Sequence, residues 1–454
     1  MISELLAADP FESYARSVNP QFVRMLRAIG FDRRWARAEG AYLFDADGNR
    51  FLDLLGGYGM FNVGRNNPRV REALVETLEL ETPGSVQLGV DALPGALADE
   101  LLHRLPDRLG KVLFTNSGTE AVEAAIKMAR GATRRHRVLG VEHAFHGLTT
   151  GSLAVGDAPE FRRPFGALLP GCDHVASGDL EALERELRRD DVALLIVEPI
   201  QGKGVNLHPP GYLAAAQRLC REHGTLFCVD EIQTGLGRTG RMFAFEHDGL
   251  EPDMVTIAKS ISGGYVPSGA LVLRTQDLLR VFDSLEHAVL HGSTFAPNDL
   301  AMAAGLATLR ELDEQRLVAR AQVLGDRLLD ATRPLVERYE VVREVRGRGL
   351  MWAIEFGEPE RGSRAWRAVE RAQHGLFAQF VVVPLFTDHH VLSQVAGHGL
   401  NVVKGLPPLT LTEKDVDGFA AALDAVLARA ERIPRSAARF ALKLGTASLS
   451  RRSS

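Results

Sequence analysis

The sequence predicts an α/β protein with two domains. The large domain surrounds a mostly parallel β-sheet, and a smaller α+β domain is built from both ends of the chain. The large domain is predicted because short apolar runs in the middle of the chain alternate with amphipathic helical patterns, such as 121–132 and 210–224. These apolar runs are continuous, which is typical of strands that βα units cover on both faces.

The strands of the large domain are predicted at six of these runs. They lie at 112–114, 137–141, 193–199, 225–230, 254–258 and 269–273. Ligands of such sheets bind beyond the carboxyl ends of the strands. The residues that follow each strand are therefore the first candidates for a functional site.

The smaller domain is predicted from regions with a different pattern. Residues 41–55 have the pattern of a hairpin, with Asp47-Gly48 as the turn. After a helical pattern at 296–338, the stretch 342–356 begins a second group of strands. Helices at 363–378 and 413–431 are expected to close this domain. The predicted division is an N-terminal part of the small domain at 1–70, the large domain at 71–325, the C-terminal part of the small domain at 326–432, and a basic tail at 433–454.

The composition narrows the class of protein. With 45% hydrophobic and 24% charged residues, the 454-residue chain has an ordinary globular composition. Its formal net charge of −5 gives no reason to expect nucleic acid or an anionic membrane as a partner. The apolar runs are shorter than the ~20 residues of a spanning helix, and the N-terminus lacks a secretory pattern. The three cysteines form no CxxC pair, so we expect a cytoplasmic protein. The basic tail is either a solvated end or a docking segment for an acidic partner.

Two charged residues end successive predicted strands. Asp230 ends the run 225–230, and Lys259 follows the run 254–258. Taken alone, the aspartate fits a helix N-cap or a metal ligand, and the lysine fits a side chain that extends to solvent. Together they fit an enzyme that needs an amine of lowered pKa and an anion beside a cofactor ring nitrogen.

A candidate anion cradle follows the first strand. Ser117, Gly118 and Thr119 open a helical pattern, where backbone N–H groups and hydroxyls face an anion. An ordinary N-cap explains the same residues. Neither a P-loop nor a GxGxxG fingerprint opens a βαβ unit, so we do not expect a nucleotide.

The segment 143–147 follows the second strand. Phe145 is placed to stack on a flat ring. His143 and His146 fit metal ligands, but no third ligand has a suitable spacing, so the sequence predicts no metal site.

Seven motifs in one order resemble the class III aminotransferases. They are TNSGTEA (115–121), HAFHG (143–147), VEPIQG (197–202), VDEIQTGLGRTG (229–240), PDMVTIAKSISGGY (252–265), HGSTF (291–295) and VRGRGLM (345–351). The likeness runs from about Tyr42 to about Leu427. It implies the fold type I of pyridoxal-phosphate-dependent transferases, with a seven-stranded type of sheet.

The resemblance also implies roles for single residues. Lys259 would be the Schiff-base lysine and proton shuttle, and Asp230 would pair with the pyridine nitrogen. The other residues implied to contact the cofactor are Gln233 at the phenolic oxygen, Phe145 on the ring, and Ser117, Gly118 and Thr119 at the phosphate. Thr294 is similar to the residue that reaches the phosphate from the other subunit, which implies a homodimer with shared sites.

The chain departs from the family pattern where substrate is recognised. Lys203 stands where members acting on α-amino acids have a glutamate, and Lys404 stands where they have a carboxylate-binding arginine. Lysine does not reproduce the bidentate fork of arginine. Two ammonium groups ~4 Å apart would repel by about 4 kcal/mol at an effective dielectric constant of 20. They therefore need an anion, separation or a lowered pKa, unless both point to solvent.

The segment 56–62 brings Tyr58, Met60 and Phe61 to the substrate side, which favours an apolar substrate chain. The predicted function is ping-pong transfer of an amino group from an amino-acid donor, glutamate or alanine, to an aldehyde or ketone. An omega-transaminase acting on an apolar-chain or terminal aldehyde or amine fits best. The alternatives are an ornithine or acetylornithine aminotransferase, an aminomutase or decarboxylase, and a binding protein without catalysis.

Overall fold

A seven-stranded sheet forms the centre of the computed structural model, which describes residues 1–84, 86, 88–360, 362, 366–367, 370–371 and 375–430. Its strands run in the order β4-β12-β11-β10-β7-β5-β6. Only β12 is antiparallel to its neighbours, so the mostly parallel sheet is confirmed. The bounds are β4 Lys111–Thr115, β12 Gly269–Leu273, β11 Met254–Ile257, β10 Leu226–Asp230, β7 Val192–Val197, β5 Arg137–Val141 and β6 Cys172–Val175.

Six of the seven strands lie where the apolar runs predict them. The short strand β6 was not predicted, because its central residues, Asp173 and His174, are polar and not buried, so it lacks the continuous apolar run of the other strands. The inner strand β7, by contrast, is buried at every residue.

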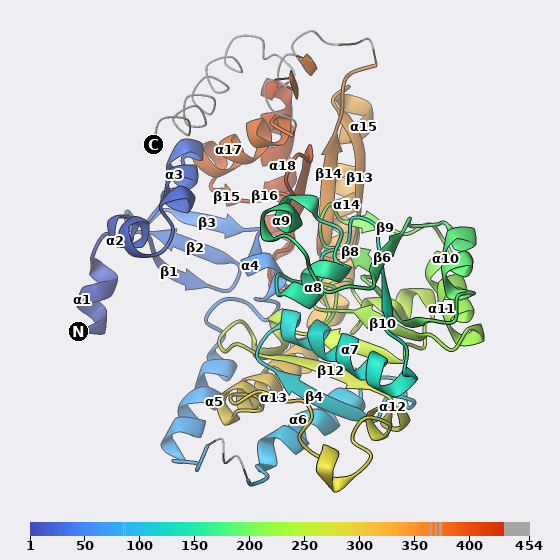
Figure 1. Cartoon of the computed structure of the whole chain (residues 1–454). Coiled ribbons are helices and arrows are strands. Elements are labelled where there is room, and N and C mark those ends of the chain that lie inside the picture. The colour runs from blue at the N-terminus through green and yellow to red at the C-terminus, as the bar shows by residue number, and fades with distance from the viewer. Residues whose placement is uncertain are drawn as a thin grey trace.

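Helices cover both faces of this sheet (Figure 1). The helix α7 (Gly118–Thr133) packs alanine, valine, isoleucine and methionine side chains against one face. The other face packs against several helices, which are α6 Ala92–Leu102, α10 Leu180–Leu187, α11 Tyr212–Glu222 and α13 Asp299–Glu314. Asp230 and Lys259 follow the carboxyl ends of neighbouring parallel strands at one edge of the sheet.

Three smaller sheets accompany the central one among the described residues. The predicted hairpin is confirmed as β2 and β3, and β15 from the C-terminal part pairs in parallel with β3. The two ends of the chain therefore meet in one sheet. The first of these sheets contains β1 Trp35–Glu39, β2 Tyr42–Asp45, β3 Arg50–Asp53 and β15 Val391–Leu392. The second contains β13 Val342–Arg348, β14 Met351–Phe356, β17 Val402–Gly405 and β16 Gln394–Val395. The third pairs β8 Ile200–Gln201 with β9 Asn206–Leu207.

Most of the predicted C-terminal helices are present. The pattern at 296–338 forms α13, α14 and α15, and the pattern at 413–431 forms α18. The predicted helix at 363–378 lies largely outside the described residues, as does the basic tail at 433–454. The remaining helices are α1 Ile2–Ala7, α2 Pro10–Ser17, α3 Pro20–Ile29, α4 Gly56–Gly59, α5 Pro68–Glu79, α8 Thr150–Val155, α9 Pro159–Arg162, α12 Thr275–Leu279, α14 Leu317–Thr332, α15 Leu335–Arg338, α17 Phe377–His389 and α18 Glu413–Ala430. Within the part of the chain that the structure describes, no helix is both long enough and apolar enough to cross a membrane.

Candidate active site

Asp230 and Lys259 lie at the carboxyl ends of β10 and β11, which are paired in parallel. Asp230 is buried, and its Oδ1 accepts hydrogen bonds from Thr256 Oγ1 at 2.9 Å and from the Ile232 N–H at 3.1 Å. Burial lowers the pKa of the Lys259 amine, although the charges of Asp230 and Glu198 act in the opposite direction. Lys259 has φ 47°, in the left-handed region that costs a side-chain-bearing residue about 1–3 kcal/mol. Strain of this kind is typical of a residue that the surrounding structure holds for a task.

His146 is the partner of Asp230. Its Nδ1 lies 2.6 Å from Asp230 Oδ2, and both side chains are buried. Burial lowers the pKa of His146, but the hydrogen bond and charge of Asp230 outweigh it and the pKa is raised. From its sequence context, His146 was a candidate only for a metal ligand. The only indication of a contact with Asp230 was that His146 follows shortly after the carboxyl end of β5, at the same edge of the sheet.

The cradle at the start of α7 has the predicted composition. Ser117 caps the helix, since its Oγ accepts from the Glu120 N–H at 3.3 Å. The Thr119 hydroxyl lies 2.6 Å from Ser152 Oγ and 2.7 Å from Thr149 Oγ1. A methyl group at Gly118 would lie 2.8 Å from Ile232 Cδ1, so a larger residue here would displace the Ile232 side chain. Thr149 and Ser152, which the sequence analysis did not identify, add two hydroxyls to this cluster.

Gln233 holds the pocket segment by its side-chain amide. Its Nε2 donates to the Tyr58 carbonyl at 3.0 Å, and its Oε1 is buried without a hydrogen-bond partner among the described residues. An unpaired amide oxygen accepts a hydrogen bond, so it fits a donor on a bound ring, such as a phenolic hydroxyl group.

Glu198 joins the ring side of the site to its substrate side. Its carboxylate accepts from the Phe145 N–H at 3.0 Å and from the Gly202 N–H at 2.8 Å. Burial raises the pKa of this carboxyl, which the nearby Asp230 charge raises further. Phe145 is half-buried, and its ring meets Phe161 edge to face with centroids 5.9 Å apart. The motif VEPIQG contains Glu198, but the residue pattern did not indicate its hydrogen-bond partners.

The two lysines at the altered positions have separate partners. Lys404 is 5% exposed, and its Nζ donates to the Gly202 carbonyl at 2.7 Å. Burial, followed by the charge of Lys259, lowers its pKa to about 8. Lys203 forms an ion pair with Glu160. The alternative in which both lysines point to solvent is therefore wrong, because Lys203 is paired with a carboxylate and Lys404 is buried with a lowered pKa.

The structure only partly places Tyr58 and Phe61 as an apolar lining of the substrate side. Tyr58 has φ 61° and is 59% exposed. Phe61 packs under the Arg65 guanidinium, 4.1 Å from the ring centroid, and so faces a cation rather than an open pocket. Thr294 is exposed, and its neighbour Ser293 accepts a hydrogen bond from Asn116 at 2.7 Å, next to the cradle.

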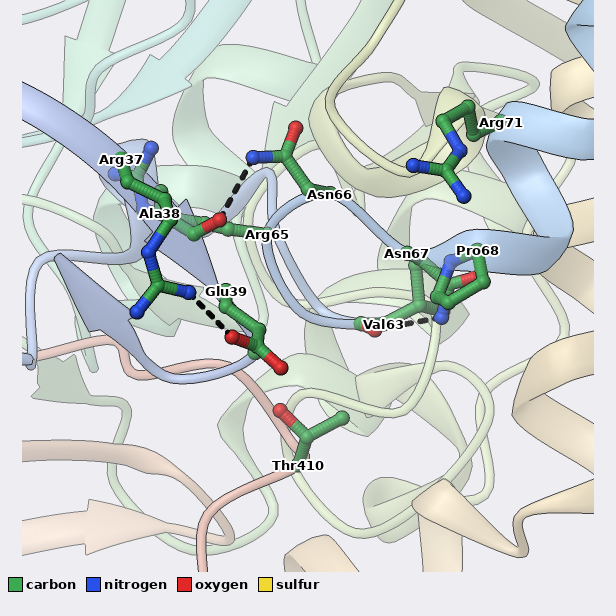
Figure 2. Close-up of a pocket in the computed structure, with 11 residues that line it drawn as sticks. Arg37, Ala38, Glu39, Val63, Arg65, Asn66, Asn67, Pro68, Arg71 and Thr410 are labelled. Carbon is green, nitrogen blue, oxygen red and sulfur yellow. Dashed lines mark hydrogen bonds and ion pairs between the residues drawn. The ribbon is translucent and has the colours of Figure 1, made fainter.

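An open pocket of about 530 Å³ lies elsewhere (Figure 2). Its wall includes Arg65, Arg71 and Thr410, and none of the strand-end residues described above lines it. Among the described residues, no group of three or more His, Cys, Asp or Glu side chains has a geometry suited to a metal ion.

The fold and the donor set fit an enzyme that binds pyridoxal phosphate, because an acid, an amine, a half-paired amide and a hydroxyl-rich helix start meet at one sheet edge. The chain matches the family Aminotransferase class-III over residues 30–427 and belongs to that pyridoxal-phosphate-dependent family. It is 36% identical to Aminotransferase PigE of Serratia sp. (strain ATCC 39006), over 94% of this chain and 54% of that protein. The chain therefore spans about half the length of that relative.

Solved structures give the same result. The ornithine aminotransferase from Toxoplasma gondii superposes with a TM-score of 0.78 at 30% identity, covering 88% of this chain and 90% of that one. An amine transaminase from an uncultivated Pseudomonas species, in its pyridoxal-phosphate-bound internal aldimine form, gives 0.77 at 31% identity, covering 87% and 94%. Both likenesses support fold type I.

Proposed function

We propose that this protein transfers an amino group between an amino-acid donor and an aldehyde or ketone with an apolar chain. The observation that carries the reaction is the strand-end pair of Asp230 and Lys259, with His146 behind the aspartate. Bound pyridoxal phosphate supplies an aldehyde carbon and a ring that withdraws electrons. The protein's own groups then have to hold that ring, keep its nitrogen protonated and move one proton.

Each of these tasks has a candidate residue. Asp230 would pair with the ring nitrogen, since His146 and Thr256 hold its carboxyl group in place. The Lys259 amine, whose pKa burial lowers, takes the proton from the amine-bearing carbon of the substrate. The cradle of Ser117, Gly118 and Thr119 binds the phosphate through the helix start.

The substrate side supports an acceptor without an α-carboxylate. The arginine–glutamate pair of relatives that act on α-amino acids is replaced, and neither lysine presents a guanidinium fork. Lys404 keeps one cation in the buried wall of the site, next to Gly202. We infer that Lys404 binds the carboxylate of the donor, glutamate or alanine, in the first half-reaction.

A homodimer is part of this proposal. Two segments expose large apolar side chains: one contains Leu88 and Val90, and the other contains Leu285 and Thr294. Leu88, Val90 and Leu285 are each at least 96% exposed. A hydrogen bond of 2.6 Å from Thr82, before the first segment, to Asp299, after the second, connects them. An exposed apolar area of this kind is typical of a protein–protein interface, which supports Thr294 as a residue that completes the partner's phosphate site.

The test is a panel of donors and acceptors, each followed as a half-reaction by the absorbance change of the cofactor. We expect glutamate or alanine as donor, and apolar terminal aldehydes or simple amines to exceed ornithine and acetylornithine by at least about tenfold in kcat/KM, or about 1.4 kcal/mol. If ornithine or acetylornithine is the best substrate, the proposed acceptor is wrong while the enzyme class remains. Release of carbon dioxide or migration of the amino group would support a decarboxylase or an aminomutase instead.

A further inference from the structure

Three separate segments meet beside Phe145. They are the helix α9, the turn at 202–203 and the turn at 396–398 between β16 and β17 (Figure 1). Phe161 of α9 lies between two rings, with Phe145 at 5.9 Å and His398 at 5.5 Å, both edge to face. This side wall adjoins the Gly202 turn that receives Lys404, so it borders the substrate side of the site.

The charges in this wall are paired within it. Lys203 is the ion-pair partner of Glu160, and their side chains are only 17% and 25% exposed. His398 Nδ1 lies 4.0 Å from the same Glu160 oxygen. Burial alone raises the pKa of the Glu160 carboxyl, but the hydrogen bond from Lys203 and the charges of Lys203 and His398 lower it overall. Glu160 is therefore a carboxylate at neutral pH.

The stem of Lys203 is also held. A methyl group at Gly397 would lie 2.7 Å from Lys203 Cε and 2.9 Å from Cγ, so the lysine packs directly on that turn. The amine therefore has one partner and little freedom to reach another. A lysine with a buried acidic partner cannot attract a second carboxylate as a free lysine does, because its charge is already compensated.

We propose that Glu160 determines acceptor specificity by neutralising Lys203, so that the wall formed with Phe161 accepts a neutral chain end and rejects a carboxylate there. This inference rests on the proposed transaminase function. It assigns to α9 a role that the family pattern does not place there, because Lys203 takes its acid from a segment more than 40 residues earlier in the chain. The class of acceptor is then an aldehyde whose far end is uncharged.

The experiment compares two acceptors of equal length, butanal and succinic semialdehyde, which differ only by a far-end carboxylate. Wild-type holoenzyme is compared with Glu160→Gln, Lys203→Met and the double variant, using the same donor throughout. Wild type should prefer butanal. Glu160→Gln should shift the ratio of kcat/KM toward succinic semialdehyde by at least about tenfold, mainly through KM, because a freed lysine binds the substrate carboxylate.

The remaining variants identify Lys203 as the origin of the gain. Lys203→Met leaves Glu160 without its cation, so its ratio should not move toward succinic semialdehyde, and the double variant should lose the gain of Glu160→Gln. The inference is overturned if Glu160→Gln leaves the ratio unchanged, or if the double variant keeps the gain. Should Glu160→Gln fail to fold, a shift of the Lys203→Met ratio toward succinic semialdehyde would overturn it. A wild-type enzyme that aminates neither aldehyde would instead refute the proposed function.

Discussion

Replacement of Lys404 by methionine should stabilise the protein while it impairs the enzyme. The amine is buried, and its pKa falls from 10.5 to about 8 because burial and the charge of Lys259 disfavour the ammonium. At ~1.4 kcal/mol for each tenfold change, this corresponds to about 3 kcal/mol of cost for the charged form at pH 7. Methionine has a similar shape, carries no charge and loses one hydrogen bond, to Gly202, worth about 1 kcal/mol. The net gain should be about 2 kcal/mol.

The pH dependence has a definite sign. Below pH 8 both the folded and the unfolded chain carry the proton, so the cost of Lys404 is fully present. Between about pH 8 and pH 10.5 the folded state has lost the proton that the unfolded state keeps, so wild-type stability rises with pH. The advantage of Lys404→Met should therefore shrink across this window. Above it, wild type should be the more stable protein by the value of the hydrogen bond.

The assay is urea unfolding of the cofactor-free protein at pH 7 and at pH 10, with equal protein concentrations because oligomers gain apparent stability with concentration. Lys414→Met is the control, since Lys414 is an exposed lysine on α18 and its loss should change little. The donor half-reaction of Lys404→Met should be slowed more than the acceptor half-reaction. A Lys404→Met protein that is less stable at pH 7, or whose difference from wild type does not change with pH, would refute the reasoning.

The other predictions concern the cofactor side. Lys259→Ala should abolish turnover and leave the fold intact, and borohydride reduction with peptide mapping should find the cofactor of wild type on Lys259; an adduct on another lysine contradicts this. Asp230→Asn should raise the barrier to proton transfer by about 3–4 kcal/mol in single-turnover experiments, and near-normal turnover would mean that another group protonates the ring. His146→Asn should have a smaller effect, because Thr256 still holds Asp230; an effect as large as that of Asp230→Asn would show that His146 does more than position it. Sedimentation should find a dimer at micromolar protein, and Thr294→Ala should weaken cofactor binding in a fluorescence titration; a fully active monomer would exclude the shared site.

The convergence of Asp230 and Lys259 could be predicted because it depends only on local patterns. Each follows a continuous apolar run, and parallel neighbouring strands place their carboxyl ends together. The contact between His146 and Asp230 could not be predicted in the same way. It depends on the order of the strands, since β7 lies between β5 and β10. Nothing in one sequence fixes that order before a fold is known.

The environment of the altered lysines could not be predicted either. Their replacement of a glutamate and an arginine indicated a change in recognition, but not where the charge would go. The partner of Lys203 is in α9, far from it in sequence, and the partner of Lys404 is a backbone carbonyl that carries no sequence signal. Long-range ion pairs and main-chain contacts depend on tertiary packing, so both solvent and a buried partner remained possible from the residues alone.

The Gly202 turn connects substrate recognition with cofactor binding. Its N–H donates to Glu198, and its carbonyl accepts from Lys404. A methyl group at Gly202 would lie only 2.4 Å from Gln233 Oε1, which has no hydrogen-bond partner among the described residues. One glycine therefore contacts both the lysine that we assign to the donor carboxylate and the amide that we assign to the cofactor. Because interiors are close-packed, a shift of this turn to admit another substrate would also move Gln233. A substitution at Glu160 in α9 can therefore change substrate specificity with less effect on cofactor binding than a substitution at the buried Lys404.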